Sequence, residues 1–159
     1  MLKKLGLTLA IAGMALVPNV SFANNQAKID VVKKAVFNGK VSPYATQEFK
    51  SILQKAHQID KKMSLLPDYE GMGCEFAEHY YLGHGNGGPE KQDFKNLKAN
   101  VLQGGDVQVT YTLWGNKESL RFKLACNGSS CLINDVHSKD FGSLKQDAKK
   151  MIATNSCGY

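Results

Sequence analysis

The 159-residue sequence lacks the short motifs by which most enzymes are recognised. It has no H-E-x-x-H pair and no G-x-S-x-G turn, and its glycine-rich stretch at residues 83–88 lacks the lysine and hydroxyl of a phosphate-binding P-loop. Its four cysteines also lack the paired C-x-x-C spacing that zinc sites favour. We therefore expect a non-enzymatic protein with no cofactor and no metal.

The sequence also has no apolar run long enough to cross a membrane. The longest run, residues 5–17, is shorter than the roughly 20 residues that a transmembrane helix needs. Two lysines precede it, and residues 21–23 (Ser-Phe-Ala) have the small-x-small pattern of a cleavage site. These features predict a cleaved signal peptide at residues 1–23. We expect residues 24–159 to form one domain, periplasmic or secreted from a bacterium, with no membrane span after cleavage.

Acidic residues are outnumbered by basic ones. The net charge of +6 becomes +4 without the two lysines of residues 1–23. The other lysines are scattered over expected helix faces, which is typical of a solvated surface. An acidic protein partner, a membrane or a cell-wall surface is the alternative interpretation. No basic stretch is interleaved with aromatic residues, so we expect no nucleic-acid partner.

The four cysteines all follow the signal segment and can pair in an oxidising compartment. Cys126 and Cys131 flank a sequence typical of a hairpin tip, which predicts a local disulfide. Cys74 and Cys157 are then left to form a second disulfide. If both disulfides form, no thiol is free to act as a nucleophile.

Three segments have the apolar spacing of helices. The first covers residues 28–37, and the second begins near Thr46 or shortly before it and ends by residue 64, ahead of a proline. The third begins at Ser143, where Ser143-x-x-Gln146 has the pattern of a capping box.

A block of strands is expected between the second and third helices. Residues 107–113 alternate between apolar and polar, and Gly115-Asn116 is a tight-turn signal that would set Val109 opposite Phe122. Another strand, at about residues 97–102, is expected to join the same sheet.

The next turn would set Cys126 opposite Cys131. Continued without interruption, this register puts Asp135 and His137 on the apolar face inside a concave sheet, unless a bulge rotates them outward. The expected fold class is α+β, with N-terminal helices packed on a curved antiparallel sheet of about four strands and a closing C-terminal helix.

Short segments spread over residues 28–153 match a known family pattern. They are Phe37-Asn38-Gly39, Tyr44-Ala45-Thr46, Phe49-Lys50-Ser51-Ile52-Leu53, Val107-Gln108-Val109, Leu120-Arg121-Phe122, Leu132-Ile133-Asn134-Asp135-Val136 and Ser143-Leu144-Lys145. In these segments the chain resembles a family of exported bacterial domains of unknown function with the cystatin-like, nuclear-transport-factor-like cone fold. Cys131 stands where the family usually has tryptophan. The resemblance implies the cone fold and transfers no catalytic residues.

Residues 69–89 are the part of the chain that this pattern explains least. Glu75 and His79 would share one face of a helix, and His84 follows after a short turn. A carboxylate with two imidazoles is a possible zinc ligand set, so a metal-dependent hydrolase is one alternative function. The Asp135 and His137 pair is a second set that an enzyme could use.

Binding is the function that we expect. Aromatic side chains near predicted loops commonly anchor protein contacts. The candidate binding residues are Tyr69, Glu75, His79, Tyr80, His84, Trp114 and Asp135. The specific hypothesis is an immunity or inhibitor protein that neutralises a secreted cell-wall-active toxin, with a periplasmic or secreted protein as partner. The alternative is a periplasmic cone domain that holds a small ligand in its concave sheet near Asp135.

Overall fold

A computed structural model describes residues 20–69 and 71–158. Most of the predicted signal peptide, residues 1–19, lies outside the described residues. The elements are α1 (Val20–Asn38), η1 (Ser42–Tyr44), α2 (Gln47–Met63), η2 (Pro67–Tyr69), α3 (Glu78–Tyr81), η3 (Lys91–Asp93), β1 (Phe94–Val101), β2 (Val107–Leu113), β3 (Asn116–Asn127), β4 (Ser130–Ser138), β5 (Gly142–Ser143) and α4 (Leu144–Thr154).

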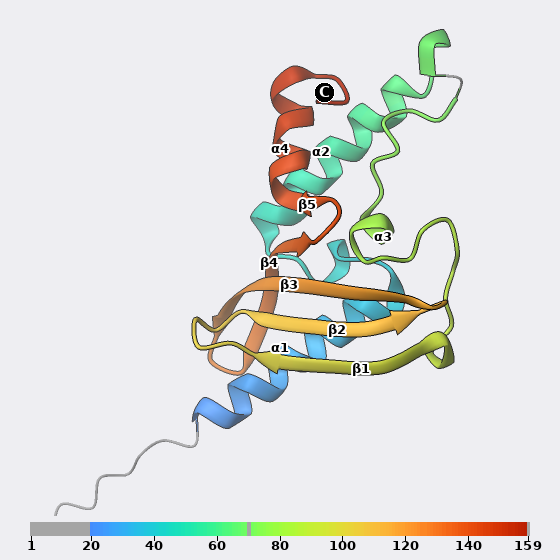
Figure 1. Ribbon diagram of the computed structural model, residues 1–159. Coiled ribbons are helices and arrows are strands. Elements are labelled where there is room, and N and C mark those ends of the chain that lie inside the picture. The colour runs from blue at the N-terminus through green and yellow to red at the C-terminus, as the bar shows by residue number, and fades with distance from the viewer. Residues whose placement is uncertain (1–19, 70, 159) are drawn as a thin grey trace, which may run out of the picture.

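The fold class is α+β, as the sequence predicts. The strands form one antiparallel sheet in the order β1-β2-β3-β4-β5, which adds the short β5 to the four strands expected. Helix α1 lies across one face of the sheet, and α2 and α4 pack side by side beyond one end of it (Figure 1). The C-terminal helix therefore closes the domain against α2.

The core lies where α1 meets the sheet. Val32, Ala35 and Val36 of α1 are fully buried, and so are the inward-facing residues of β2 and β3. Those residues are Val107, Val109, Leu120 and Phe122. Apolar side chains of α1 thus occupy the face of the sheet on which the alternative function placed a small ligand.

The predicted caps explain where two helices begin. The side chain of Thr46 accepts a hydrogen bond from Phe49 N at 3.3 Å, so α2 starts at Gln47. Ser143 Oγ accepts from Gln146 N at 3.0 Å, which starts α4 as the capping-box pattern predicts. Helix α1 begins at Val20, well before the predicted start at residue 28.

The predicted register of β2 with β3 is wrong by two residues. The turn uses Trp114 and Gly115, with φ angles of +50° and +90°, and Val109 therefore pairs with Leu120 instead of Phe122. Mirror-image hairpin turns need positive φ at both central residues, and here the first of them is a tryptophan. A shift of two residues leaves each side chain on the same face of the sheet. Pairing apolar with apolar residues therefore fits both registers equally well and cannot distinguish them.

The predicted pairing of Cys126 with Cys131 is confirmed, and a bulge follows it. The register shifts by one residue between Lys123 and Leu124, so Lys123 pairs with Asp135 and Arg121 pairs with His137. The bulge therefore rotates Asp135 and His137 off the apolar row, which decides between the two alternatives that the sequence left open.

Both predicted disulfides are present. Cys74 is bonded to Cys157 over a sequence separation of 83, and Cys126 is bonded to Cys131 across the β3–β4 turn. All four cysteines are paired, so none offers a free thiol. Among the helices of the described part of the chain, none has the length and apolar character needed to cross a membrane.

Candidate functional site

The segment between α2 and β1 is tied down at its start. We call residues 72–88 the stapled segment, because the Cys74–Cys157 disulfide joins it to the C-terminus. Asp60 Oδ1 accepts hydrogen bonds from Cys74 N at 2.7 Å and from Phe76 N at 3.3 Å. Between these bonds, Glu75 has a φ of +53°, a strained conformation for a residue with a side chain. The backbone here is held in one shape.

A buried carboxylate ties down the other part of the segment. Glu78 accepts hydrogen bonds from the backbone N–H groups of Val41 and Ser42 and from Ser42 Oγ, and its Oε1 lies 3.3 Å from His57 Nε2. Burial raises the pKa of Glu78, but the bonds from His57, Ser42 and Val41 outweigh it and hold the pKa below its usual value. Glu78 therefore stays ionised and joins α3 to the start of η1.

Three of the predicted site residues come together. Glu75, His79 and Tyr80 line one hollow of about 520 Å³, whose wall also includes Met72 and Asn86. Glu75 precedes α3 instead of sharing a helix face with His79, because its left-handed backbone turns the chain before the helix begins. The rings of His79 and Tyr80 are 4.5 Å apart.

A second hollow, of about 300 Å³, shares the Glu75 and Tyr80 wall and extends to α4. Tyr81 Oη donates a hydrogen bond to Asp147 Oδ2 at 2.7 Å. Phe141, which is 51% exposed, has its ring centroid 5.5 Å from that of Tyr81. This hollow therefore combines aromatic walls with charged groups at its rim.

A third hollow of about 290 Å³ lies on the other side of His79 and Asn86, against residues 37–40. Since neighbouring hollows share wall residues, the three form one continuous surface. We call this surface the stapled face. Its principal residues are Met72, Glu75, His79, Tyr80, Asn86 and Phe141.

His84 lines the third hollow together with His79 but does not complete a metal-ligand set with Glu75 and His79. Its side chain is buried beside Gly39 and the ring of Phe94. Within the described residues, no three His, Cys, Asp or Glu side chains are close enough to hold a metal ion. The structure therefore does not assemble the predicted ligand set of Glu75, His79 and His84.

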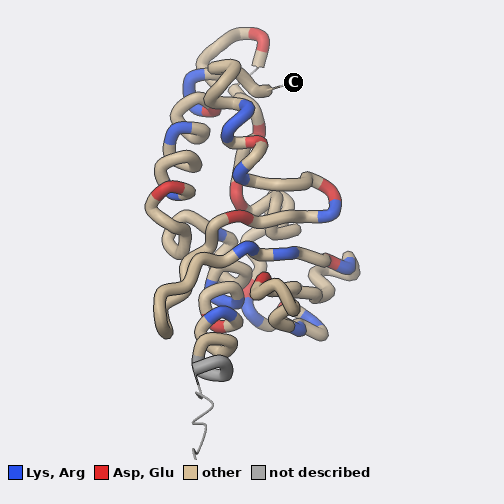
Figure 2. The backbone as a smooth tube through the Cα atoms, turned by 90° about the vertical axis from the view of Figure 1, so that its left-hand side faces the viewer, with Lys and Arg blue, Asp and Glu red and all other residues tan. Residues whose placement is uncertain are grey.

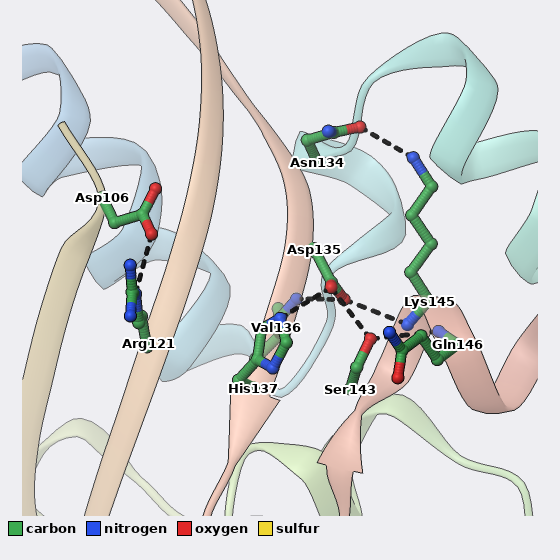
Figure 3. Close-up of polar contacts among 9 residues, drawn as sticks. All are labelled: Asp106, Arg121, Asn134, Asp135, Val136, His137, Ser143, Lys145 and Gln146. Atoms are coloured by element: carbon green, nitrogen blue, oxygen red, sulfur yellow. Dashed lines mark hydrogen bonds and ion pairs between the residues drawn. The ribbon is translucent and has the colours of Figure 1, made fainter. Parts of the chain in front are cut away.

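Asp135 anchors α4 (Figure 3). Its Oδ1 accepts hydrogen bonds from Val136 N at 2.8 Å and Lys145 N at 3.0 Å, and its Oδ2 accepts from Ser143 Oγ at 2.8 Å. His137 Nε2 lies 2.8 Å from Oδ2, although it is not aligned for a hydrogen bond. The carboxylate satisfies an N–H group of the first turn of α4 that has no partner within the helix. Asp135 thus has a structural role in joining β4 to α4.

The two remaining predicted residues differ in position. Trp114, 54% exposed, lies in the β2–β3 turn with its ring against Gly87, where a Cβ would come within 2.4 Å of the indole. Trp114 thus adjoins the end of the stapled segment. Tyr69 is half-buried and packs against the core.

Sequence reasoning did not find two residues of this region. Glu78 is bonded to backbone groups 36 and 37 residues away, so no local pattern reveals it. Phe141 follows a turn near the C-terminus and has no spacing relation to the stapled segment. Comparison with protein-family models, with curated proteins and with solved structures finds no match to this chain.

Proposed function

We propose that this chain is an exported binding protein that holds a protein partner on the stapled face. The observation that carries the proposal is the combination of exposed apolar side chains with a fixed backbone. Met72 is 62% exposed and Phe141 is 51% exposed. The Cys74–Cys157 disulfide and the hydrogen bond from Cys74 N to Asp60 hold the backbone next to Met72 in place. A preorganised surface loses little conformational entropy on binding.

The composition of the stapled face fits a protein interface. Such interfaces have apolar and aromatic side chains at the centre and polar groups around them. Here Met72, Tyr80 and Phe141 supply the apolar area, and Glu75 and Asn86 supply polar groups beside it. Leu65, which is 78% exposed just beyond α2, adds apolar surface near the same end of the molecule.

The specific form that we propose is an immunity or inhibitor protein of the periplasm or cell exterior that neutralises a secreted cell-wall-active toxin. The signal segment and two disulfides support an extracytoplasmic location. The curved sheet around α1 supports membership in the cone-fold family, which we also propose.

The second candidate function is binding of a small ligand. We place this ligand on the stapled face instead of in the concave sheet. The hollow beside Phe141 has a volume of about 300 Å³, at the lower end of the roughly 300–1,000 Å³ of ligand pockets. Its aromatic walls and the charges of Asp147 and Lys150 could hold a small polar ligand.

Affinity capture from periplasmic extract tests the proposed function. The wild-type chain should capture a cell-wall hydrolase, identified by mass spectrometry, and should inhibit it in solution. The double variant Met72→Asp/Phe141→Asp should bind that hydrolase at least ten-fold more weakly, because it places charges at the centre of the interface. The matched control is Leu132→Asp, an exposed apolar residue on the β3–β4 hairpin.

Equal capture by the double variant and the wild-type chain would place the interface elsewhere. Capture of no hydrolase would remove the immunity hypothesis. If neither the wild type nor the double variant captures a protein, but a small molecule co-purifies with the wild type alone, small-ligand binding becomes the favoured function.

A further inference from the structure

Helix α1 covers one face of β1, β2 and β3, and in the described part of the chain no helix lies over their opposite face (Figure 1). Pairing in β1, β2 and β3 identifies the ten residues whose side chains share the uncovered face. They are Lys95, Lys98, Asn100, Gln108, Thr110, Thr112, Lys117, Ser119, Arg121 and Lys123. Five of the ten are Lys or Arg and none is apolar, and on β4 the same row continues with His137 opposite Arg121 and the buried Asp135 opposite Lys123. We call the set of ten residues the outward face.

The acidic groups nearby neutralise only part of the charge of the outward face. Asp106, in the β1–β2 loop, pairs with Arg121 at 2.7 Å. Glu118 belongs to the inward row by its pairing with Tyr111, and a Cβ on Gly83 would come within 2.5 Å of its Cδ, but its side chain also lines the depression described below. The four lysines of the outward face are exposed and left with a net positive charge.

The outward face is also hollowed. A depression of about 460 Å³ is lined by three lysines, Lys98, Lys117 and Lys139, and by one carboxylate, that of Glu118. Hydroxyl groups of Thr110, Thr112 and Ser119 also line it. The register of β1 shifts between Lys95 and Lys98, and such a bulge bends its strand. Three cations, three hydroxyl groups and one carboxylate therefore surround one recess.

We propose that the outward face binds an acidic polysaccharide, a linear glycan that carries carboxylate, sulfate or phosphate groups. Lysines can pair with the anionic groups, and the Thr, Ser, Gln and Asn side chains can exchange hydrogen bonds with sugar hydroxyls. Neighbouring strands lie about 4.8 Å apart and alternate residues about 6.7 Å apart, so an extended polymer can contact several cations at once. This binding is independent of the stapled face and goes beyond the proposed function.

The composition of the outward face argues against other anionic partners. Protein interfaces have an apolar and aromatic centre, which the ten residues lack. Single-stranded nucleic acid is bound by stacking on aromatic rings, and none is present in this row. Amphipathic membrane-binding surfaces insert apolar side chains beside the cations, and the ten residues include none. Purely electrostatic attraction to anionic lipid is tested below with vesicles. A hydroxyl-rich polyanion needs none of these aromatic or apolar side chains.

Basic residues also occur along the helices (Figure 2). The experiment must therefore distinguish binding that depends on the lysines of the sheet from binding that depends only on the net charge of the protein. The test variant is Lys98→Gln/Lys117→Gln/Lys123→Gln, which removes three exposed lysines of the outward face. The matched control is Lys34→Gln/Lys50→Gln/Lys55→Gln, which removes three exposed lysines from α1 and α2. Both variants have the same net charge.

Heparin serves as the probe, with binding measured by titration and by the salt concentration that elutes each protein from a heparin column. The sheet variant should bind at least ten-fold more weakly than wild type, and the helix variant should stay within two-fold of it. Binding should weaken as salt rises, because the attraction is Coulombic and exposed. Unchanged thermal unfolding of both variants checks that they fold, and a Lys→Arg version of the sheet variant should retain binding.

Two results would overturn the proposal. Equal weakening in both variants would show attraction to net charge alone, without a site. Equally tight binding of wild type to polyglutamate or to anionic lipid vesicles would point to an acidic protein or a membrane instead of a glycan. Capture of the hydrolase on the stapled face should be the same in the sheet variant and wild type, so each proposal can fail without the other.

Discussion

His84 shows how its surroundings change what a residue can do. In the sequence it is a possible metal ligand, but in the fold only 2% of it is exposed. Burial, against an opposing hydrogen bond with the backbone of Val36 and with a smaller contribution from nearby His79, lowers its pKa to about 4. A Cβ on Gly39 would lie 2.8 Å from His84 Nδ1, so a glycine with φ of +62° is needed at that contact. His84 is a neutral packing residue.

Acidification should therefore weaken the fold between pH 6.5 and about pH 4. In that range the unfolded chain takes up a proton at His84 that the native chain does not, so stability falls as pH falls. One pKa unit corresponds to about 1.4 kcal/mol, so the loss should reach about 3 kcal/mol by pH 4. Urea unfolding at pH 7, 6, 5 and 4 measures the free energy of unfolding at each step.

The variant His84→Leu should lose this part of the pH dependence, while His57→Gln should keep it. If His84→Leu does not fold, NMR titration of the wild-type chain gives the same information, because the ring of His84 should stay neutral at pH 5. An imidazole signal of His84 that titrates near pH 6.5 would contradict the assignment.

At the scale of elements, the two disulfides stabilise different parts of the fold. The Cys126–Cys131 bond closes the β3–β4 hairpin, which backbone pairing already holds. The Cys74–Cys157 bond joins the chain beyond α4 to the start of the stapled segment, and these regions are 83 residues apart. The second bond therefore restricts the unfolded chain far more than the first.

Removing the long-range disulfide should cost more stability than removing the hairpin disulfide. The loss of chain entropy on closing the two loops predicts about 4.5 kcal/mol for Cys74→Ser/Cys157→Ser and about 2 kcal/mol for Cys126→Ser/Cys131→Ser. Thermal unfolding of both variants measures the order, and hydrogen exchange should show faster opening around residues 72–77 in the first variant alone. A lower melting temperature for the hairpin variant would contradict this account.

Local signals predicted the elements well and their long-range relations less well. Thr46 and Ser143 start their helices as expected, because a cap acts on an N–H group only three residues away. The β2–β3 register depended on a tryptophan that adopts positive φ, which no pattern indicates. Glu75 and His79 line one hollow, but they do not share a helix face as predicted, because Glu75 precedes α3. Glu78 was missed because its partners are distant.

At the scale of the whole molecule, the predicted cleavage site falls within α1. Helix α1 begins at Val20, whereas cleavage after residue 23 would leave Asn24 as the first residue. The fully buried residues of α1, Val32, Ala35 and Val36, all follow that point. Cleavage would therefore shorten the helix without removing any of these core contacts.

Expression of the full chain in a bacterial host should yield a periplasmic protein that comprises residues 24–159. Intact mass spectrometry should find the mass of this sequence less four hydrogen atoms, two for each disulfide. The variant Ala23→Arg disrupts the small-x-small pattern and should retain the signal segment. A wild-type chain that keeps residues 1–23, or stays in the cytoplasm, would rule out the predicted signal.

The bulge in β1 has a consequence for how copies of this chain meet one another. Strand β1 is an open edge of the sheet, and a straight edge strand offers unpaired N–H and C=O groups to another molecule. Here Asn96, with φ of +54°, interrupts the row of ladder bonds, and Lys95 and Lys98 flank the interruption with like charges. When the β1 strands of two molecules approach each other, their lysines repel and the bulges prevent a continuous row of hydrogen bonds. The irregular strand thus protects the chain against growing into fibrils through its own sheet.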